Sequence, residues 1–204
     1  MTITAAHIKE LRDKTGAGML DCKTALEKND GDLQKAADFL RQKGIASADK
    51  KKDRMASQGR IVSYIHHSHT VGVLLEVNSE TDFVAKTDDF THLCKELAMQ
   101  IAALAPTFVS RQEIPAEVIE REKAGYKKIA MDEGKKEEMA DKIATGKVEK
   151  YFEKICLLDM PYVKDDKQKV GDLVRSTSGK LGENIVVRRF VRFALGETAG
   201  QKAE

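Results

Sequence analysis

The chain has 204 residues, with 35 Lys and Arg against 33 Asp and Glu, and its formal net charge is +2. Proteins that coat nucleic acid usually carry a large positive excess, so any basic patch here must be local. Apolar residues make up 41% of the chain, too many for a disordered polymer, and no apolar run approaches the ~20 residues of a membrane span. The first residues lack the basic segment and apolar block of a signal peptide, so we expect a cytoplasmic protein.

The N-terminal part of the chain, residues 1–45, predicts three short helices. Thr4 can cap the first, and the glycine-rich turn 15–18 breaks it. Asp32 can cap the third, and Gly44 is a typical C-terminal stop. The pattern therefore predicts a small helical bundle. Its apolar residues recur at helical spacing: Ile8 and Leu11, then Met19, Cys22 and Leu26, then Leu33, Ala36, Ala37 and Leu40.

A charged, exposed linker, either irregular or helical, is expected next, over residues 46–58. Its centre, residues 49–54, is a run of lysines, aspartates and arginine, which is usually solvated surface. The pattern then changes to that of strands. Residues 61–65 and 71–77 are rich in β-branched side chains and flank a short polar loop, residues 66–70, as in a β-hairpin.

Helices and a last strand complete the predicted core, residues 59–204. A helix follows the cap Thr87, with one apolar stripe: Phe90, Leu93, Cys94, Leu97, Ile101 and Leu104. Residues 115–158 are helical and highly charged, with a break near Gly134 that indicates an antiparallel helical hairpin. Ile129 and Met139 are expected on the thin apolar stripe of this hairpin. Another short helix precedes a long final strand, residues 185–195. The sequence therefore predicts an α+β fold: a three-helix bundle, then a core with a three-stranded antiparallel sheet, packed helices and the helical hairpin.

The sequence contains none of the motifs that would indicate an enzyme. It has no G-x-x-x-x-G-K-[ST] phosphate loop, no complete dinucleotide fingerprint and no G-x-S-x-G elbow. The three cysteines, Cys22, Cys94 and Cys156, lie far apart and form no C-x-x-C pair. We expect them to be reduced packing residues, and we expect no metal site and no cofactor.

Two stretches of the core leave alternatives open. His67 and His69 could share one face of a strand and bind a metal, or lie with His66 at a solvated hairpin tip. In the final strand, Arg and Phe alternate over residues 188–193, a pattern that could stack on RNA bases and neutralise phosphates. The alternative is a strand with one core face and arginines paired across the sheet. An RNA-binding translation protein is therefore the second functional hypothesis.

The segment between the second strand and the next helix, residues 78–86, places Phe83 in a polar and acidic turn. One interpretation is that the ring is buried beneath its own loop. The other is that an apolar wedge stands beside the Asp82 carboxylate, presented from a rigid junction between strand and helix.

The same segment carries a resemblance. Residues 81–85, Thr-Asp-Phe-Val-Ala, resemble a signature of the elongation factor Ts family, the guanine-nucleotide exchange factors of elongation factor Tu. Residues 11–23 resemble the N-terminal signature of that family, and residues 29–32 and 40–46 continue it. Residues 190–197 resemble its closing strand, so the motifs follow one another in the family's order along nearly the whole chain.

The resemblance implies a translation elongation factor that performs no covalent chemistry. It implies that Thr81, Asp82, Phe83 and Val84 disturb the Mg²⁺ and phosphate site of elongation factor Tu, with Phe83 as the wedge. GDP then leaves, and the factor itself leaves when GTP binds. Residues 1–45 would resemble a ubiquitin-associated domain and dock on the partner. The expected docking residues are Arg12, Met19, Leu20 and Lys23.

Longer members of the family carry two related core modules, and this chain has room for one. The resemblance therefore implies a homodimer that binds two copies of elongation factor Tu, without direct contact to nucleic acid or a membrane. We expect the final strand to supply the contact between the two copies, because an unpaired strand edge invites pairing.

Overall fold

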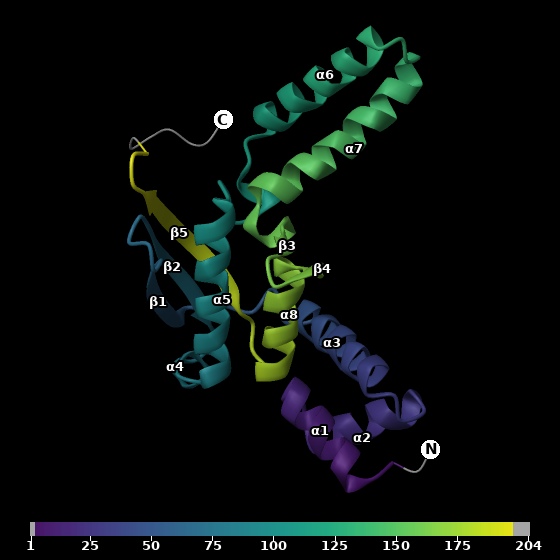
Figure 1. Cartoon of the computed structure of the whole chain (residues 1–204), viewed down its shortest axis with the longest axis vertical. Helices are drawn as coiled ribbons and strands as arrows, with labels where there is room; N and C mark the ends of the chain where they lie inside the picture. The colour runs from purple at the N-terminus through teal and green to yellow at the C-terminus, as the bar shows by residue number, and fades with distance from the viewer. Residues whose placement is uncertain (1–2, 198–204) are drawn as a thin grey trace. The chain divides into compact units, whose positions relative to one another are not determined.

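The computed structural model describes residues 3–197 (Figure 1). Contacts within the chain divide it into two compact units, each built from three stretches of sequence. The first unit comprises residues up to 60, residues 77–93 and residues 172–186; the second comprises residues 61–76, residues 94–171 and those from 187 onward. Because the chain passes repeatedly from one unit to the other, the predicted domains 1–45 and 59–204, with the linker 46–58 between them, stay a prediction.

Three helices open the first unit: α1 (Ala5–Thr15), α2 (Met19–Lys28) and α3 (Leu33–Asp49). The Thr4 hydroxyl accepts a hydrogen bond from the first turn of α1 (3.3 Å), and the Asp32 carboxylate accepts two from the first turn of α3. Such oxygens pair the N–H groups that a helix start leaves free. The predicted bundle is confirmed, with a buried core of Leu11, Cys22, Ala25, Leu26, Ala36 and Leu40.

The prediction that the third helix ends at Gly44 is wrong. Helix α3 continues to Asp49, so the first residues of the predicted linker, 46–58, are helical. Gly44 lies instead against α8 (Val170–Leu181), where a Cβ added to Gly179 would stand 2.2 Å from the Gly44 carbonyl oxygen. The two glycines let two helix backbones approach closely, which the pattern of a single helix does not reveal.

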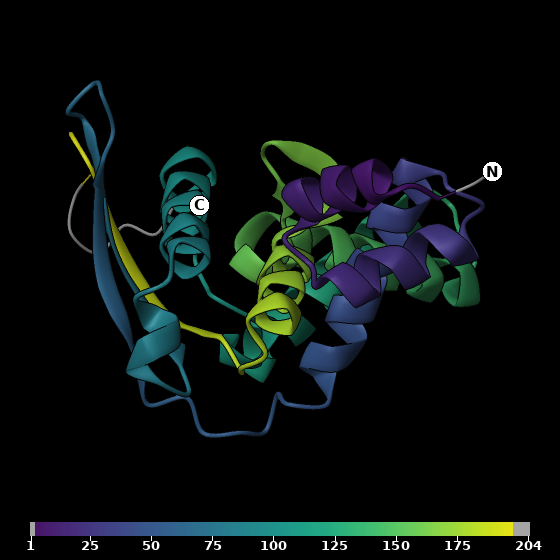
Figure 2. The same ribbon diagram turned by 90° about the horizontal axis from the view of Figure 1, so that it is seen from below.

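The predicted three-stranded antiparallel sheet is confirmed. It consists of β1 (Gln58–Ile65), β2 (Val71–Ser79) and β5 (Val186–Ala194), with β2 in the middle. Helix α5 (Asp88–Leu104) lies along one face of the sheet, as Figures 1 and 2 show. Alternate residues of β2 are therefore buried: Val73, Leu75 and Val77.

Helix α5 begins where the sequence predicts, because the Thr87 hydroxyl accepts a hydrogen bond from the Phe90 N–H (3.3 Å). Leu104, expected on its apolar stripe, is exposed, since the helix ends there and Ala105 turns the chain away with a φ of 48°. No helix among residues 3–197 is both long and apolar enough to span a membrane. The rest of the stripe is buried as expected: Phe90, Leu93, Cys94, Leu97 and Ile101.

A second, two-stranded sheet was not predicted. It pairs β3 (Pro161–Tyr162) with β4 (Asp165–Lys169), and both strands are short and polar, so no period-2 apolar pattern marks them. Two buried polar residues of α5 hold it. Glu96 accepts a hydrogen bond from the Tyr162 hydroxyl. The Gln100 amide donates to the Pro161 carbonyl of β3 and accepts from the Val163 N–H directly after that strand (2.9 Å each).

The predicted helical hairpin is confirmed as α6 (Ala116–Asp132) and α7 (Glu137–Ile155), which run side by side in Figure 1. Gly134 turns the chain between them with a φ of 81°. Ile129 and Met139, both expected on the apolar stripe, are exposed instead. Alanines are buried between the two helices in place of these larger side chains, which a prediction from apolarity alone does not favour. The buried residues of the hairpin helices are Ala130, Ala140, Ala144, Val148 and Phe152.

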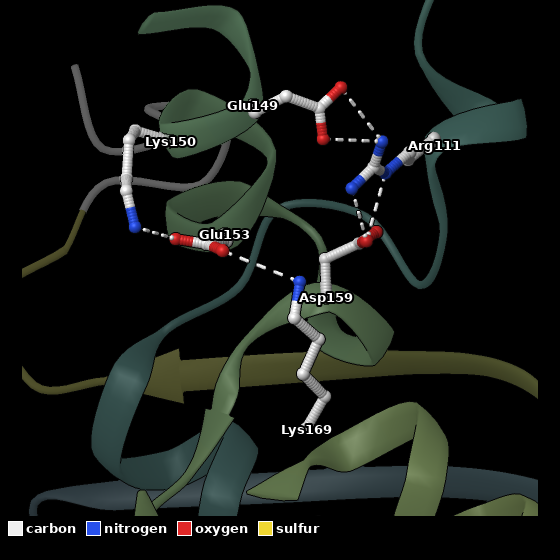
Figure 3. Close-up of polar contacts among 6 residues, drawn as sticks. All are labelled: Arg111, Glu149, Lys150, Glu153, Asp159 and Lys169. Carbon is white, nitrogen blue, oxygen red and sulfur yellow. Dashed lines mark hydrogen bonds and ion pairs between the residues drawn. The ribbon is translucent and has the colours of Figure 1, made fainter. Parts of the chain in front are cut away.

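Arg111 anchors the base of the hairpin, as Figure 3 shows. Its guanidinium donates to Asp159 (2.8 Å) and pairs with Glu149 (2.9 Å). It also lies over the Phe152 ring, 4.6 Å from the centroid. The hydrogen bonds to Asp159, above all, raise the pKa of Arg111. One cation thereby joins the loop before α6 to the end of α7 and the turn beyond it.

A second ion-pair cluster in the same view centres on Glu153 of α7. Its carboxylate pairs with Lys150 (2.8 Å) and with Lys169 of β4 (3.3 Å). These two lysines, Lys150 first, hold the pKa of Glu153 below its ordinary value. The small sheet is therefore tied to the hairpin as well as to α5.

Candidate functional site

The turn after β2 presents an aromatic ring to solvent. Its short helix α4 (Asp82–Ala85) is capped by Thr81, whose hydroxyl accepts a hydrogen bond from the Val84 N–H (3.3 Å). Ala85 is buried beneath the turn, whereas the Phe83 side chain is 80% exposed. The ring is therefore not buried beneath its own loop, and the first interpretation of this segment is wrong.

A carboxylate stands beside the ring. Asp82 pairs with Lys86, one helical turn later, at 2.6 Å. The hydrogen bond from Lys86 is the main reason that the pKa of Asp82 lies below its ordinary value, so the group stays ionised near neutral pH. The Lys86 ammonium also lies 6.0 Å from the centre of the Phe83 ring. The turn thus exposes an aromatic ring next to a pair of opposite charges.

Residues from a distant part of the chain, which the sequence did not indicate, hold this turn in place. Glu183, in the segment between α8 and β5, accepts hydrogen bonds from the Thr81 N–H (3.0 Å) and the Thr81 hydroxyl (2.6 Å). The N–H of Asn184 donates to Glu80 (2.7 Å), and its side-chain amide donates to the backbone carbonyls of Lys52 and Arg54. Residues more than a hundred positions apart form this support, so no local pattern could have indicated it.

The four predicted docking residues all lie on the surface of the bundle. Arg12 is on the last turn of α1, and Lys23 pairs with Glu27 on α2 at 3.8 Å. Met19 and Leu20 begin α2 and are 56% and 77% exposed. Met19, placed by its spacing on the apolar core stripe, is therefore not a core residue. Its position at the first residue of the helix, directly after Gly18, explains why it escapes burial.

Lys180 of α8 connects the glycine-rich turn to the neighbourhood of α4. Its side chain lies so close to Gly16 that a Cβ there would come within 2.1 Å of Cε. Its ammonium pairs with Asp89, at the start of α5, at 2.6 Å. The predicted docking residues and the Thr81–Val84 turn belong to the same compact unit.

The second unit has an exposed apolar face on its sheet. Two shallow hollows lie on it, one lined by Ile61, Leu74 and Val191, the other by Ile65 and Phe193 among others. Phe193 is 71% exposed and Leu195 is 83% exposed. A patch of this kind is typical of an interaction surface. We call it the outer sheet face: Ile61, Ile65, Leu74, Val191, Phe193 and Leu195.

Two of the three arginines of β5 have acidic partners. Arg189 pairs with Glu76 of the neighbouring strand at 2.7 Å. Arg192 donates to the Ala102 carbonyl of α5 (3.3 Å) and pairs with Glu197 (2.8 Å). These two arginines match the paired-strand alternative. The RNA hypothesis stays a prediction.

The histidines lie at the hairpin tip. The His66 ring bonds to the Tyr64 hydroxyl (3.0 Å) and lies 4.1 Å from the His67 ring, and His69 has a left-handed φ of 56°. Within residues 3–197, no three His, Cys, Asp or Glu side chains are grouped so that they could hold a metal ion.

The three cysteines, Cys22, Cys94 and Cys156, are buried and form no disulfide among the described residues. Burial raises the pKa of the Cys156 thiol to about 12. Their expected role as packing residues fits this burial.

Comparison with known proteins finds a matching family and close relatives of this chain. The model of the family described as elongation factor TS matches residues 47–197. The elongation factor Ts of Heliobacterium modesticaldum is 52% identical over 202 residues, covering 99% of this chain and 94% of that protein. The elongation factor Ts of Coprothermobacter proteolyticus is 53% identical over 197 residues, covering 97% of this chain and 100% of that protein.

Proposed function

We propose that this chain, which belongs to the elongation factor Ts family, releases GDP from the GTPase elongation factor Tu. Membership of the family makes it a translation elongation factor. The finer steps are our proposal: the chain acts in the cytoplasm, performs no covalent chemistry, binds elongation factor Tu with GDP in place, and leaves when GTP binds.

The exposed Phe83 is the observation that carries this proposal. An apolar ring that is 80% exposed on a firmly anchored turn can enter a partner and displace packed elements there. In GTPases, Mg²⁺ neutralises the phosphates of the bound nucleotide. When Phe83 and Asp82 shift the groups that hold this ion, the phosphates lose that neutralisation and GDP dissociates faster. Thr81 and Val84 shape the turn through the hydrogen bond between them.

The thermodynamics of exchange require no chemistry from this chain. The factor must bind the nucleotide-free GTPase more tightly than the GDP-bound one. Linkage then makes GDP weaken the factor by the same ratio by which the factor weakens GDP. A binding surface and a wedge therefore suffice, and a catalytic group is unnecessary.

The N-terminal bundle supplies docking affinity in this proposal. Met19 and Leu20 offer exposed apolar anchors, and Arg12 and Lys23 lie on the same bundle as charged neighbours. Buried apolar anchors usually dominate binding energy, whereas exposed charges contribute little, so Leu20 is the central residue. The likeness of the bundle, residues 1–45, to a ubiquitin-associated domain is also part of the proposal.

A homodimer completes the proposal, with one elongation factor Tu bound to each copy. The outer sheet face exposes six apolar side chains, three of them from β5 or the residue after it. A second copy of this chain would cover that face by presenting the same face. The contact we propose therefore uses the face of the final strand rather than its edge alone.

Release of labelled GDP from bacterial elongation factor Tu tests the proposal. The unaltered protein should accelerate release, and Phe83→Ala should lower the accelerated rate about tenfold or more, the loss expected for a central anchor. The Phe83→Ala protein should keep its melting temperature, because an exposed ring contributes little to folding. Absence of acceleration by the unaltered protein would refute the exchange function.

A further inference from the structure

The Thr81 hydroxyl has two partners that fix its orientation. It donates its proton to Glu183 at 2.6 Å and accepts the Val84 N–H at 3.3 Å. A hydroxyl has one proton, and the hydroxyl rotates so that this proton points to its strongest acceptor, here the Glu183 carboxylate. With the proton committed to Glu183, a lone pair of the oxygen faces the first turn of α4. Glu183 thereby sets the cap on which α4 depends.

Glu183 also fixes the backbone that enters the turn. Its second carboxylate oxygen accepts the Thr81 N–H at 3.0 Å, so one carboxylate holds both the main chain and the side chain of Thr81. Two charge-assisted hydrogen bonds from Thr81 to one planar carboxylate restrict the position and the rotation of Thr81 together. Phe83 lies only two residues further on, and its own side chain is exposed, so its direction depends on this anchor.

Asn184, the residue after Glu183, joins the same two segments, but here it is the hydrogen-bond donor. The Asn184 N–H donates to Glu80 at 2.7 Å, while its side-chain amide donates to the carbonyl of Arg54 at 2.7 Å. Asn184 is itself buried. Glu80 and Thr81 are thus matched, residue by residue, with Asn184 and Glu183. A backbone held on both sides in this way moves little, whatever the exposed ring does.

We propose that Glu183 is a positioning residue for nucleotide exchange, acting through Thr81 to hold Phe83 in its working direction; this inference rests on the exchange function proposed above. Glu183 need not touch the partner. Its contribution is preorganisation: it removes turn conformations in which the ring would meet the partner wrongly. Loss of Glu183 should therefore lower the rate within the complex more than the affinity of the complex.

The test measures GDP release from elongation factor Tu at increasing concentrations of the full-length protein. Glu183→Ala should lower the saturating release rate about tenfold, equivalent to about 1.4 kcal/mol. The concentration that gives half this rate should stay within about twofold, because the docking surface of the bundle is unchanged. Glu117→Ala, which removes an exposed carboxylate of α6, is the matched control and should match the unaltered protein.

Glu183→Gln keeps the volume and one acceptor, so its saturating rate should fall between those of the unaltered protein and Glu183→Ala. Melting temperatures are measured for every variant. In the Phe83→Ala background, Glu183→Ala should change the rate by less than about twofold, because the residue acts only through that ring.

The outcomes separate this inference from the function on which it rests. No acceleration by the unaltered protein refutes the exchange function. Normal acceleration with a loss in Phe83→Ala but none in Glu183→Ala or Glu183→Gln refutes only the positioning role. An equal loss with and without Phe83 also refutes it, since that result indicates a merely structural residue.

Discussion

Gly179 of α8 lies directly against Gly44 of α3, with the carbonyl oxygen of Gly44 where a side chain of residue 179 would begin. Gly179→Ala would place its Cβ 2.2 Å from that oxygen, so the two helices must separate. We expect a loss of roughly 1–3 kcal/mol in unfolding free energy, the usual cost of overpacking. Denaturant unfolding measures it.

Gly146→Ala is the control for that substitution. Gly146 lies inside α7, and apart from the backbone of its own helix no atom lies within 4 Å of an added Cβ. The change should raise stability by about 0.5–1 kcal/mol, because glycine disfavours helix interiors. Equal effects of the two substitutions would contradict the close packing of α3 on α8.

Leu20→Ala tests the docking surface. Leu20 is 77% exposed, so the protein should unfold at an unchanged temperature. The concentration of the factor needed for half-maximal GDP release should rise about tenfold or more, as for a central interface anchor, while the saturating rate stays the same. Gln42→Ala, an exposed change on α3 of the same bundle, serves as the control and should leave the half-maximal concentration unchanged. A lower saturating rate with unchanged half-saturation would mean that Leu20 does not dock.

Phe193→Asp tests the homodimer. A carboxylate buried in an apolar contact between two copies would lack a partner, so the dimer should dissociate. Light scattering during gel filtration should give twice the chain mass for the unaltered protein and the chain mass for the variant. Lys167→Asp, an exposed change on β4, should leave the mass unchanged. A single-chain mass for both proteins would exclude the proposed dimer.

Arg111→Ala should loosen the base of the helical hairpin. Removing the guanidinium leaves the largely buried Asp159 carboxylate without its main partner, and we expect a loss of about 1–3 kcal/mol. Lys142→Ala removes an ion pair with Glu138 in which both side chains are exposed, and it should cost less than about 0.5 kcal/mol. Thermal unfolding of the two variants compares these losses. A larger loss for Lys142→Ala would contradict the role of Arg111 as the anchor of the hairpin.

Burial of Cys156 predicts a loss of stability at alkaline pH. The pKa of its thiol rises from 9.0 to about 12 in the folded protein. Between these values the unfolded chain releases the proton and the folded chain keeps it, so rising pH favours unfolding. The contribution is complete below pH 9 and is lost as the pH approaches 12. Burial and the bond to Glu96 also raise the pKa of Tyr162, which adds in the same direction.

Unfolding free energies measured from pH 8 to 11 check this sign. The Cys156→Ala protein should be less stable at neutral pH, because a packed side chain is truncated, but its stability should fall less steeply with pH. Parallel pH curves for the two proteins would show that the buried thiol does not titrate as proposed.

Local chemistry made several elements predictable. Thr4, Asp32 and Thr87 are caps whose hydrogen bonds lie within three residues, so they can be recognised in a short stretch of sequence. The hairpin turn at Gly134 is equally local, because it needs a left-handed φ that glycine adopts without strain. The sheet followed from the alternation of β-branched residues along its strands.

Features that depend on partners far away in the sequence could not be predicted from local patterns. The strands β3 and β4 are too short and polar to show a period, and buried groups of α5 hold them. Glu183 resembles any exposed carboxylate in the sequence until the fold brings it to Thr81. Gly44 predicts a helix stop in the sequence, because glycine serves both at helix ends and where two helices cross closely.

By itself, the sequence determined the helices, the strands and the family signature around Phe83, because caps, periodicity and motifs are properties of neighbouring residues. Only the tertiary structure decided that Phe83 is exposed and that Met19 is not in the core. It also decided that Glu183 holds the turn, and that one sheet face stays apolar and uncovered. Exposure and long-range hydrogen bonds depend on which segments meet in space, and no local pattern encodes that meeting.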